Sequence, residues 1–322
     1  MSARSRQALV FRLASTVLSF LPRRLTLPLA HALGQLSYFL LGRRRQVALD
    51  NLTATLGRDW GEAERRRVAR RSFGHSIAMG MDLLTLPAVT RSPTRYCTVE
   101  EGSLELLRGV LAERKGALLV AGHFGLMESM GILLGHEKIT LHFVSKPFDD
   151  PSLDAAVNAL RGATGNGFIH KGGAKDRILE TLASGEAVAV VADQHVHGKD
   201  RAWIPWFGLP AATTRSLGTM ALLSGAPLVP IHSFPRPGGR AHLEFGPAIR
   251  PGAMPEDPDE ARAVAERLVA LATVELEKAV RRQPGDWLWL HRRFKVCPEG
   301  LEDRYPPRTE PVPWEWTGFD SK

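Results

Sequence analysis

The strongest constraint on the fold of this chain is a regular alternation of short apolar runs with longer amphipathic segments between residues 117 and 284. Short apolar runs bounded by turn signals predict buried strands, and apolar residues recurring every three or four positions predict helices. The expected strands are 117–123, 139–146, 167–171, 187–194, 228–234 and 241–249, and the expected helices are 124–134, 151–165, 174–186, 216–227 and 258–284. Strands that alternate with helices predict an α/β layered fold with a mixed, largely parallel sheet flanked by helices.

The charge of the chain is concentrated at its N-terminal end. Residues 1–71 contain 14 Arg and no Lys against four acidic residues, a net charge of +10, whereas the remainder carries −2. A basic face spread over a folded domain would suggest nucleic acid. A basic end on a nearly neutral body instead favours contact with an anionic surface, so we expect a membrane and no nucleic acid as partner.

Two apolar stretches, 8–22 and 25–42, lie within this basic end and are separated by Arg23 and Arg24. Neither reaches the roughly 20 apolar residues that a spanning helix needs. Three interpretations remain open: a short or tilted span, a pair of helices lying in the membrane interface, and a helical hairpin packed on the body. The segment 61–84 that follows has the apolar periodicity of another helix.

Two acid–base candidates follow the ends of predicted strands. His123 comes directly after the strand at 117–123, and Glu128 lies five residues further on, where a carboxylate in the next turn of helix could reach back to the imidazole. Asp193 ends the strand at 187–194, the usual place for functional groups in open α/β sheets, although a loop-anchoring hydrogen bond would explain it equally well.

Basic side chains also follow these strands, and metal chemistry is not expected. Lys146, Arg161 and Lys171 could receive phosphates, although any one of them is more often a solvated charge. His195 and His197 have no further ligand at a companion spacing, so we predict no metal. The two cysteines, Cys97 and Cys297, are too few for a disulfide framework or a cysteine-built zinc site.

Two aromatic segments remain without an assigned element at this point. The run WIPWFGLPAATTRS (203–216) either lines a groove, meets a membrane or packs as an ordinary loop. The run DWLWLHRRFK (286–295) combines tryptophans with basic residues and predicts either an interfacial cluster or a terminal element packed by its tryptophans.

Taken in order, these motifs resemble the bacterial lysophospholipid acyltransferase superfamily, and within it the late lipid A acyltransferase branch. The motifs are RRRQVALDNL (43–52), HFGLME (123–128), Lys146-Pro147…Leu153-Asp154…Arg161…Gly165, ADQH with PWFG and PAATTRS (192–216), GAPLVPI (225–231) and DWLWLHRRFKVCPEG (286–300). The HFGLME box matches an H-x-x-x-x-D/E pattern in its Glu form. The chain departs from the pattern where Lys146 and Lys171 stand in places that often hold Arg.

The resemblance implies the chemistry of an acyltransferase without a cofactor. His123 would be the general base for an acceptor hydroxyl, Glu128 would orient it, and backbone N–H groups in the turn after His123 would stabilise the oxyanion. Arg161 with Lys146 or Lys171 would hold phosphates. Asp193 and Gln194 would shape the floor of the site.

The resemblance also implies the substrates and the location. The acyl donor would be an acyl carrier protein, the acceptor a lipid A precursor, and the place the cytoplasmic face of the bacterial inner membrane. A different acceptor, such as a phosphatidylinositol mannoside, with acyl coenzyme A as donor, is the alternative. We expect a membrane anchor at 1–45, an acyltransferase domain at 46–300 and an irregular tail at 301–322.

Overall fold

The computed structural model describes residues 3–295 and 298, so the predicted tail at 301–322 lies outside the described residues. The helices are α1 (Ala3–Phe20), α2 (Arg23–Leu40), α3 (Gly42–Leu56), α4 (Glu62–Leu84), α5 (Leu86–Arg91), α6 (Pro93–Tyr96), α7 (Ser103–Ala112), α8 (Met127–His136), α9 (Pro151–Arg161), α10 (Ala174–Ala183), α11 (Ser216–Ser224), α12 (Pro258–Arg282) and the 3-10 turn η1 (Pro284–Asp286). The strands are β1 (Cys97–Val99), β2 (Ala117–Ala121), β3 (Leu141–Ser145), β4 (Gly167–His170), β5 (Ala187–Val191), β6 (Arg201–Trp206), β7 (Leu209–Thr214), β8 (Leu228–Arg236) and β9 (Arg240–Phe245).

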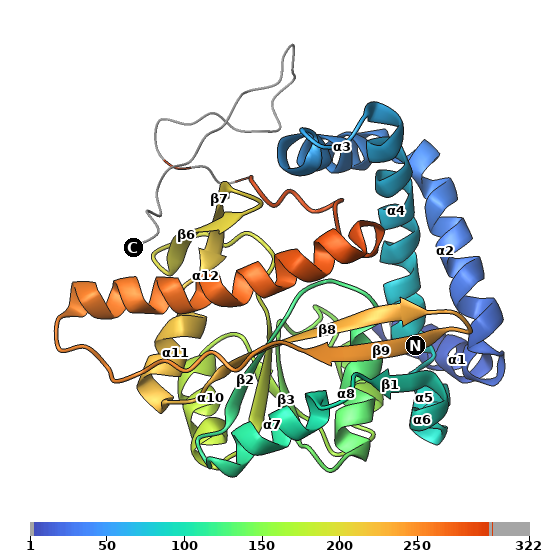
Figure 1. Cartoon of the computed structure of the whole chain (residues 1–322). Coiled ribbons are helices and arrows are strands. Elements are labelled where there is room, and N and C mark those ends of the chain that lie inside the picture. The colour runs from blue at the N-terminus through green and yellow to red at the C-terminus, as the bar shows by residue number, and fades with distance from the viewer. Residues whose placement is uncertain (1–2, 296–297, 299–322) are drawn as a thin grey trace.

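Seven of these strands form the central sheet, in the order β1-β9-β8-β2-β5-β3-β4 (Figure 1). The pairs on both sides of β2 and β3 are parallel, and β1 is parallel to β9, whereas β8 and β9 form an antiparallel hairpin. The predicted α/β fold with a mixed, largely parallel sheet is confirmed. The carboxyl ends of β2, β3 and β5 lie together at one edge of this sheet, where ligands bind in open α/β folds.

Strand β2 shows why the sheet needs a layer of helices on both faces. All five of its residues are buried, as expected for a parallel strand covered on both sides. Leu119 and Ala121 belong to the cluster that contains α7 and α8, and Leu118 and Val120 belong to the cluster that contains α10, α11 and α12. A run without polar alternation therefore occupies the centre of a three-layered structure.

The N-terminal helices form a separate lobe beside the sheet (Figure 1). Helix α2 packs along α4 and buries Leu27, Ala30, Gly34 and Tyr38. The approach is close at Gly34, where a Cβ would lie 2.3 Å from the carbonyl oxygen of Phe73. Within residues 3–295 and 298, none of the helices combines the length and the apolar character that crossing a bilayer requires.

The opposite side of these helices carries most of the exposed apolar side chains of the described chain. Thirteen large apolar residues between positions 9 and 41 are at least 44% exposed. They are Leu9, Val10, Leu13, Val17, Phe20, Leu21, Leu25, Leu29, Leu33, Leu36, Phe39, Leu40 and Leu41, which we call the apolar face of α1–α2. Exposed Arg24, Arg43 and Arg44 border it.

The two aromatic segments pack in the interior. Residues 201–214 form the β6–β7 hairpin, in which Trp206 is 1% exposed and Phe207 is 7% exposed. Both rings contact the tryptophans of the C-terminal segment, Trp287 and Trp289. Of the alternatives for these segments, the structure therefore has ordinary packing, and it adds a hairpin that the sequence did not predict.

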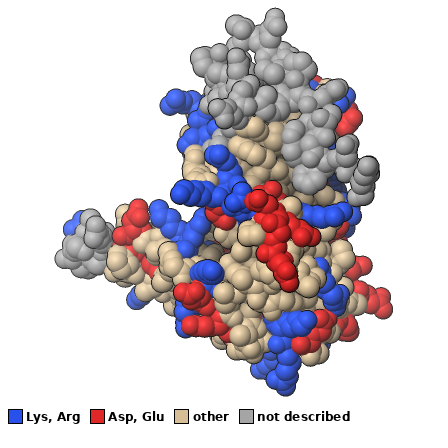
Figure 2. Space-filling view, turned by 90° about the vertical axis from the view of Figure 1, so that its left-hand side faces the viewer, with Lys and Arg blue, Asp and Glu red and all other residues tan. Residues whose placement is uncertain are grey.

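Charged side chains on the body are mixed in sign. Figure 2 shows one face on which Lys and Arg lie beside Asp and Glu, with uncharged surface between them. This mixture agrees with the near-zero net charge of the chain beyond residue 71.

The turn between β2 and α8 requires glycine at position 125. Gly125 has φ +63°, and a Cβ there would lie 1.4 Å from the carbonyl oxygen of Ser233 on β8. We predict that Gly125→Ala lowers the free energy of unfolding by about 3 kcal/mol or more, because left-handed strain and overpacking add. Thermal or urea unfolding measures the change.

Gly109→Ala is the matched control. Gly109 lies in α7, and a Cβ added there would meet no atom within 4 Å, so alanine should stabilise the helix by roughly 0.5–1 kcal/mol. Equal stability of the Gly125→Ala variant and the wild type would show that the turn does not need this backbone conformation.

Candidate active site

His123 stands at the carboxyl end of β2, in a turn held by a hydrogen bond of its own and by contacts with the C-terminal segment. The backbone N–H of Phe124 donates to the carbonyl of Gly122 (2.7 Å), and that of Gly125 donates to the carbonyl of Asp286 (3.0 Å). Phe124 also forms an isolated bridge with Trp287 of the C-terminal segment. The two amides that follow His123, those of Phe124 and Gly125, therefore already have hydrogen-bond partners within the protein.

Asp193 holds the imidazole of His123. Its Oδ1 lies 2.8 Å from Nδ1 of His123, and its Oδ2 accepts from the backbone N–H of His123 (2.6 Å) and from Nε1–H of Trp287 (2.8 Å). Because the carboxylate can only accept a hydrogen bond, Nδ1 carries the proton and is the donor. Nε2 is therefore unprotonated in the neutral ring. Asp193 is buried, and the side chain of His123 is 25% exposed.

The electrostatics of this pair follow from its geometry. Burial opposes the charged imidazolium, but the Asp193 carboxylate, and after it Glu128, outweigh burial and raise the pKa of His123 above its ordinary value. Burial would also raise the pKa of Asp193, but His123 and the hydrogen bond from Trp287 hold it at about 2. Asp193 is therefore a carboxylate at neutral pH, and His123 is a base strengthened by it.

Glu128 pairs with Arg161 and does not reach back to the imidazole as the sequence spacing predicts. Two nearly parallel hydrogen bonds join them, Nε to Oε2 (2.8 Å) and Nη2 to Oε1 (2.5 Å). The reason is that Glu128 occupies the first turn of α8, facing the end of α9, whereas the end of β5 brings Asp193 beside His123. The carboxylate hydrogen-bonded to the imidazole is that of Asp193, and Glu128 acts on the ring only through space.

A cavity of about 730 Å³ opens between the carboxyl ends of β2, β3 and β5. Six of the seven predicted site residues line it: His123, Glu128, Lys146, Arg161, Lys171 and Gln194. The seventh, Asp193, is buried behind His123. The amide nitrogen of Gln194 lies 3.3 Å from Nε2 of His123, which places a polar hydrogen donor next to the basic nitrogen.

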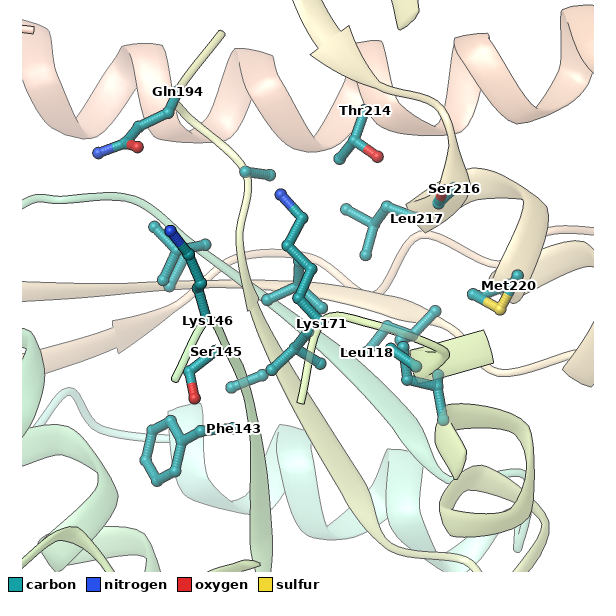
Figure 3. Close-up of a pocket in the computed structure, with 18 of the residues that line it drawn as sticks. Leu118, Phe143, Ser145, Lys146, Lys171, Gln194, Thr214, Ser216, Leu217 and Met220 are labelled. Carbon is teal, nitrogen blue, oxygen red and sulfur yellow. The ribbon is translucent and has the colours of Figure 1, made fainter. Parts of the chain in front are cut away.

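Basic side chains lie on one side of the cavity, and part of its apolar lining lies on the other. In Figure 3, Lys146 and Lys171 extend toward the side where Gln194 lies, while Leu118, Leu217 and Met220 lie in the other part, with Thr214 and Ser216 beside them. Volumes of 300–1,000 Å³ with few polar groups on an apolar lining are typical of sites for small amphipathic ligands. The arrangement suits a ligand with a charged head and an apolar chain.

Three supporting residues had no predicted role in the site, although Trp287 belongs to the aromatic run at 286–295. Trp287 donates to Asp193, Asp82 accepts from the first turn of α8, and buried His75 lies behind the turn with Nε2 3.4 Å from the carbonyl oxygen of His123. Burial lowers the pKa of His75 to about 4 and keeps that ring neutral. Asp82 had one available signal, because it is a lone carboxylate within the apolar sequence MGMDLL.

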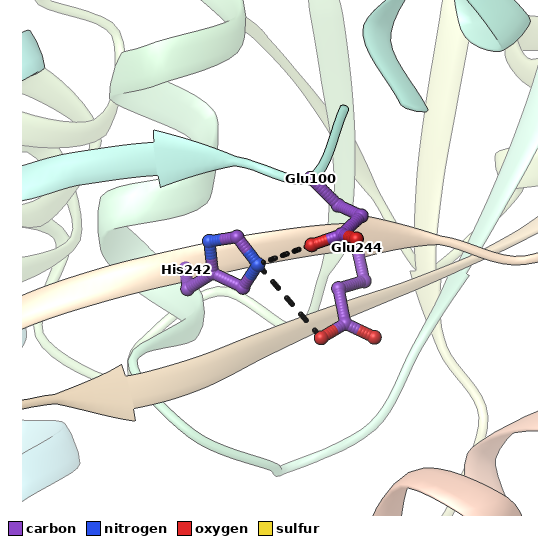
Figure 4. Close-up of side chains that lie close together, drawn as sticks. All are labelled: Glu100, His242 and Glu244. Carbon is purple, nitrogen blue, oxygen red and sulfur yellow. Dashed lines mark hydrogen bonds and ion pairs between the residues drawn. The ribbon is translucent and has the colours of Figure 1, made fainter. Parts of the chain in front are cut away.

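A second titratable cluster lies at the far edge of the sheet (Figure 4). Nε2 of His242 lies 2.8 Å from Glu100 and 3.9 Å from Glu244. Arg282 donates to both oxygens of Glu244, at 2.5 and 2.8 Å. The group is therefore an ion-pair cluster in which the Arg282 guanidinium supplies the positive charge. It lies outside the cavity that contains His123.

Comparisons with known proteins agree on one group of enzymes. The sequence profile described as bacterial lipid A biosynthesis acyltransferase matches residues 7–296. The lipid A biosynthesis lauroyltransferase of Escherichia coli (strain K12) is 28% identical over 288 residues, which cover 88% of this chain and 90% of that protein. The lipid A biosynthesis palmitoleoyltransferase of the same organism is 24% identical over 277 residues, covering 85% and 86%.

The comparison with solved structures also found similar chains. The 1-acyl-sn-glycerophosphate (LPA) acyltransferase PlsC from Thermotoga maritima aligns with a TM-score of 0.35 and 14% identity, over 78% of this chain and 98% of that one. At this level the likeness adds nothing to what the sequence profile shows.

We predict that the ring of His123 titrates above pH 6.5, and that Asp193→Asn moves the midpoint to lower pH because it removes the main group that favours the imidazolium. Nuclear magnetic resonance of the imidazole nitrogens as a function of pH measures both midpoints. Glu180→Gln, an exposed carboxylate on α10, is the control and should leave the His123 midpoint unchanged. A wild-type midpoint at or below 6.5 would contradict the assigned electrostatics.

Proposed function

Because this chain belongs to the bacterial lipid A biosynthesis acyltransferase family, it is an acyltransferase of lipid A biosynthesis, and we propose that His123 and Asp193 carry the transfer. The observation that supports this most strongly is that His123 lines the cavity while Asp193 holds its Nδ1. A base with its second nitrogen fixed by a carboxylate is the arrangement that general-base catalysis by histidine requires.

In the proposed reaction, Nε2 of His123 takes the proton of an acceptor hydroxyl, and the oxygen attacks the carbonyl carbon of an acyl thioester. The new C–O bond forms, the C–S bond breaks, and the leaving thiolate takes the proton back from His123. No covalent bond to the protein is needed. The negative charge of Asp193 stabilises the imidazolium while it exists, and the amide of Gln194 lies where the reacting oxygens would gather.

Glu128 and Arg161 serve as a second unit of the proposed site. Their paired hydrogen bonds fix the guanidinium at the cavity, with 20% of the Arg161 side chain exposed. The remaining donors of Arg161, together with Lys146 and Lys171, would bind phosphates of the substrates. Glu128 also favours the protonated form of His123 through space.

The apolar side of the cavity would take the acyl chain. Leu118, Ile178, Leu217 and Met220 line it, and burying an alkyl chain among such residues gains roughly 0.8 kcal/mol per methylene. We propose an acyl carrier protein as the donor and a lipid A precursor as the acceptor. Acyl coenzyme A with a phosphatidylinositol mannoside is the alternative, since both donors present the same thioester and phosphate groups.

The apolar face of α1–α2 would hold the enzyme on the membrane. An exposed face of thirteen large apolar side chains, bordered by arginines, is typical of helices that lie in a bilayer interface. We propose that α1 and α2 rest on the cytoplasmic face of the inner membrane, with Arg24, Arg43 and Arg44 near lipid phosphates.

His123→Ala should lower kcat for acyl transfer by about 10²- to 10⁴-fold, the usual contribution of a general base. The assay uses purified enzyme in detergent, with acyl carrier protein and coenzyme A thioesters offered separately, and with a lipid A precursor and a phosphatidylinositol mannoside as acceptors. Mass spectrometry detects the gain of one acyl chain.

His136→Ala is the control for this assay, because His136 is exposed in the last turn of α8 and should keep full turnover. Near wild-type turnover by His123→Ala would refute the base assignment. Product with the mannoside and coenzyme A alone would establish the alternative substrates.

Leu29→Asp with Leu33→Asp should reduce binding to anionic phospholipid vesicles by at least ~10-fold, because each change removes an apolar side chain worth roughly 1.5–3 kcal/mol when buried. The two residues are 61% and 54% exposed on α2, so the fold should tolerate the change. Flotation of the protein with vesicles measures binding. Leu223→Asp on α11, 46% exposed and outside the apolar face, is the control, and equal flotation of all three proteins would exclude α1–α2 as the binding surface.

A further inference from the structure

A fully buried ion pair lies between the N-terminal helices and the helix that carries Glu128. Arg23 and Asp82 are both 0% exposed, and Nη2 of Arg23 lies 2.8 Å from Oδ1 of Asp82. The rest of the guanidinium donates to Oγ1 of Thr85 (2.8 Å) and to the carbonyl of Gly239 in the β8–β9 turn (3.0 Å). A buried charge pair of this kind is costly to desolvate, so it is weak evidence for stability and calls for another explanation.

The second oxygen of Asp82 points at the start of α8. Oδ2 accepts from the backbone N–H of Glu128 (3.0 Å) and of Ser129 (3.1 Å), and the hydroxyl of Ser129 donates to Oδ1. These are the second and third residues of α8, whose amides have no partner within the helix. The residue preceding α8, Leu126, offers no side-chain cap, so a carboxylate from α4 caps the helix instead.

We infer that Asp82, held in place by Arg23, is a positioning residue that fixes the first turn of α8 and thereby sets Glu128 against Arg161 at the catalytic cavity. The inference rests on the proposed function only for its kinetic consequence. The amide of the residue whose carboxylate pairs with Arg161 is itself bonded to Asp82. Displacing that amide moves the Glu128 side chain, and displacements of about 1 Å in a site typically cost ~10²-fold in rate.

Arg23 connects this arrangement to the helices that carry the apolar face of α1–α2. It is the first residue of α2, and its neighbours Leu21 and Leu25 are 47% and 61% exposed on the apolar face. Arg23 lies on the inward side of α2, where it neutralises the carboxylate that caps α8.

The decisive variant replaces both members of the pair with apolar residues, Arg23→Met with Asp82→Leu. Replacing a buried ion pair in this way commonly preserves folding, whereas removing one partner leaves an uncompensated charge. We expect a folded protein by thermal melting, with kcat reduced by about 10- to 100-fold and KM for the lipid acceptor within ~3-fold of wild type. Glu137→Gln, which breaks the ion pair of Glu137 with Arg108 just beyond the other end of α8, is the matched control and should retain wild-type kcat.

Two further measurements separate positioning from a general structural role. In a protein that already carries Glu128→Gln, adding the paired replacement should lower kcat by less than ~3-fold relative to Glu128→Gln alone. The reason is that the effects of substitutions at residues that act through one another are not additive. The acid limb of kcat/KM should also move to lower pH in the paired variant, since Glu128 contributes to the raised pKa of His123. Full additivity with an unmoved acid limb would overturn the inference.

Hydrogen exchange at the amides of Glu128 and Ser129 tests the placement without any catalytic assay. Exchange should become at least ~10-fold faster in the paired variant and stay unchanged in Glu137→Gln, because a lost cap frees amides only in the first turn. Unchanged protection in the paired variant would overturn the inference. Absence of acyl transfer by the wild-type enzyme would instead refute the proposed function and leave the exchange result standing.

Discussion

The hydrogen bonds of the Asp193 carboxylate are the interactions on which the candidate active site of this structure depends. The carboxylate is buried, it accepts from the backbone and the ring of His123, and it accepts from the indole of Trp287. An ionised carboxylate is costly to bury unless its oxygens are satisfied by donors. The three donors meet that requirement, and in doing so they bring together the end of β2, the end of β5 and the C-terminal segment. The same bonds that stabilise the charge also fix the tautomer of the imidazole.

Helices α3 and α4 and the segment 286–291 are tied to the same place, so motifs far apart in the sequence meet behind His123. Asn51 on α3 donates to the carbonyls of Trp289 and His291, each at 2.8 Å. Ser72 on α4 donates to the carbonyl of Trp287 (2.5 Å), and Arg71 pairs with Asp286. The carbonyl of Asp286 then accepts from the backbone N–H of Gly125 in the turn after His123. Residues far apart in the sequence therefore form one continuous scaffold behind His123.

Much of the sheet could be predicted from the sequence because buried parallel strands are continuous apolar runs, as at 117–121 and 187–191. The β6–β7 hairpin was not predicted, because Pro205 and Pro210 argue against strands and the turn Phe207-Gly208 lacks the usual Asn-Gly or Asp-Gly signal. For the site, position after a strand identified His123 and Asp193. The pairing between them follows from β2 and β5 being neighbours in the sheet, a fact of topology that spacing along the chain does not contain. Spacing favoured Glu128 instead, because it is closer in sequence.

The first forty residues show why a boundary drawn from composition divides the chain differently from its packing. Composition separates an apolar, basic end from a neutral body, and the exposed face of α1–α2 agrees with that division. Packing does not, because α2 buries Leu27, Ala30 and Tyr38 against the body, and Arg23 neutralises a carboxylate inside it. A helix pair that lies on a membrane contacts lipid only through its outer face. A buried charged residue such as Arg23 therefore stabilises the interior of the protein and does not contact the membrane. The helices that would contact the lipid therefore also help to hold the first turn of α8. Asp82 forms both contacts, because it pairs with Arg23 of α2 and accepts from the backbone N–H of Glu128.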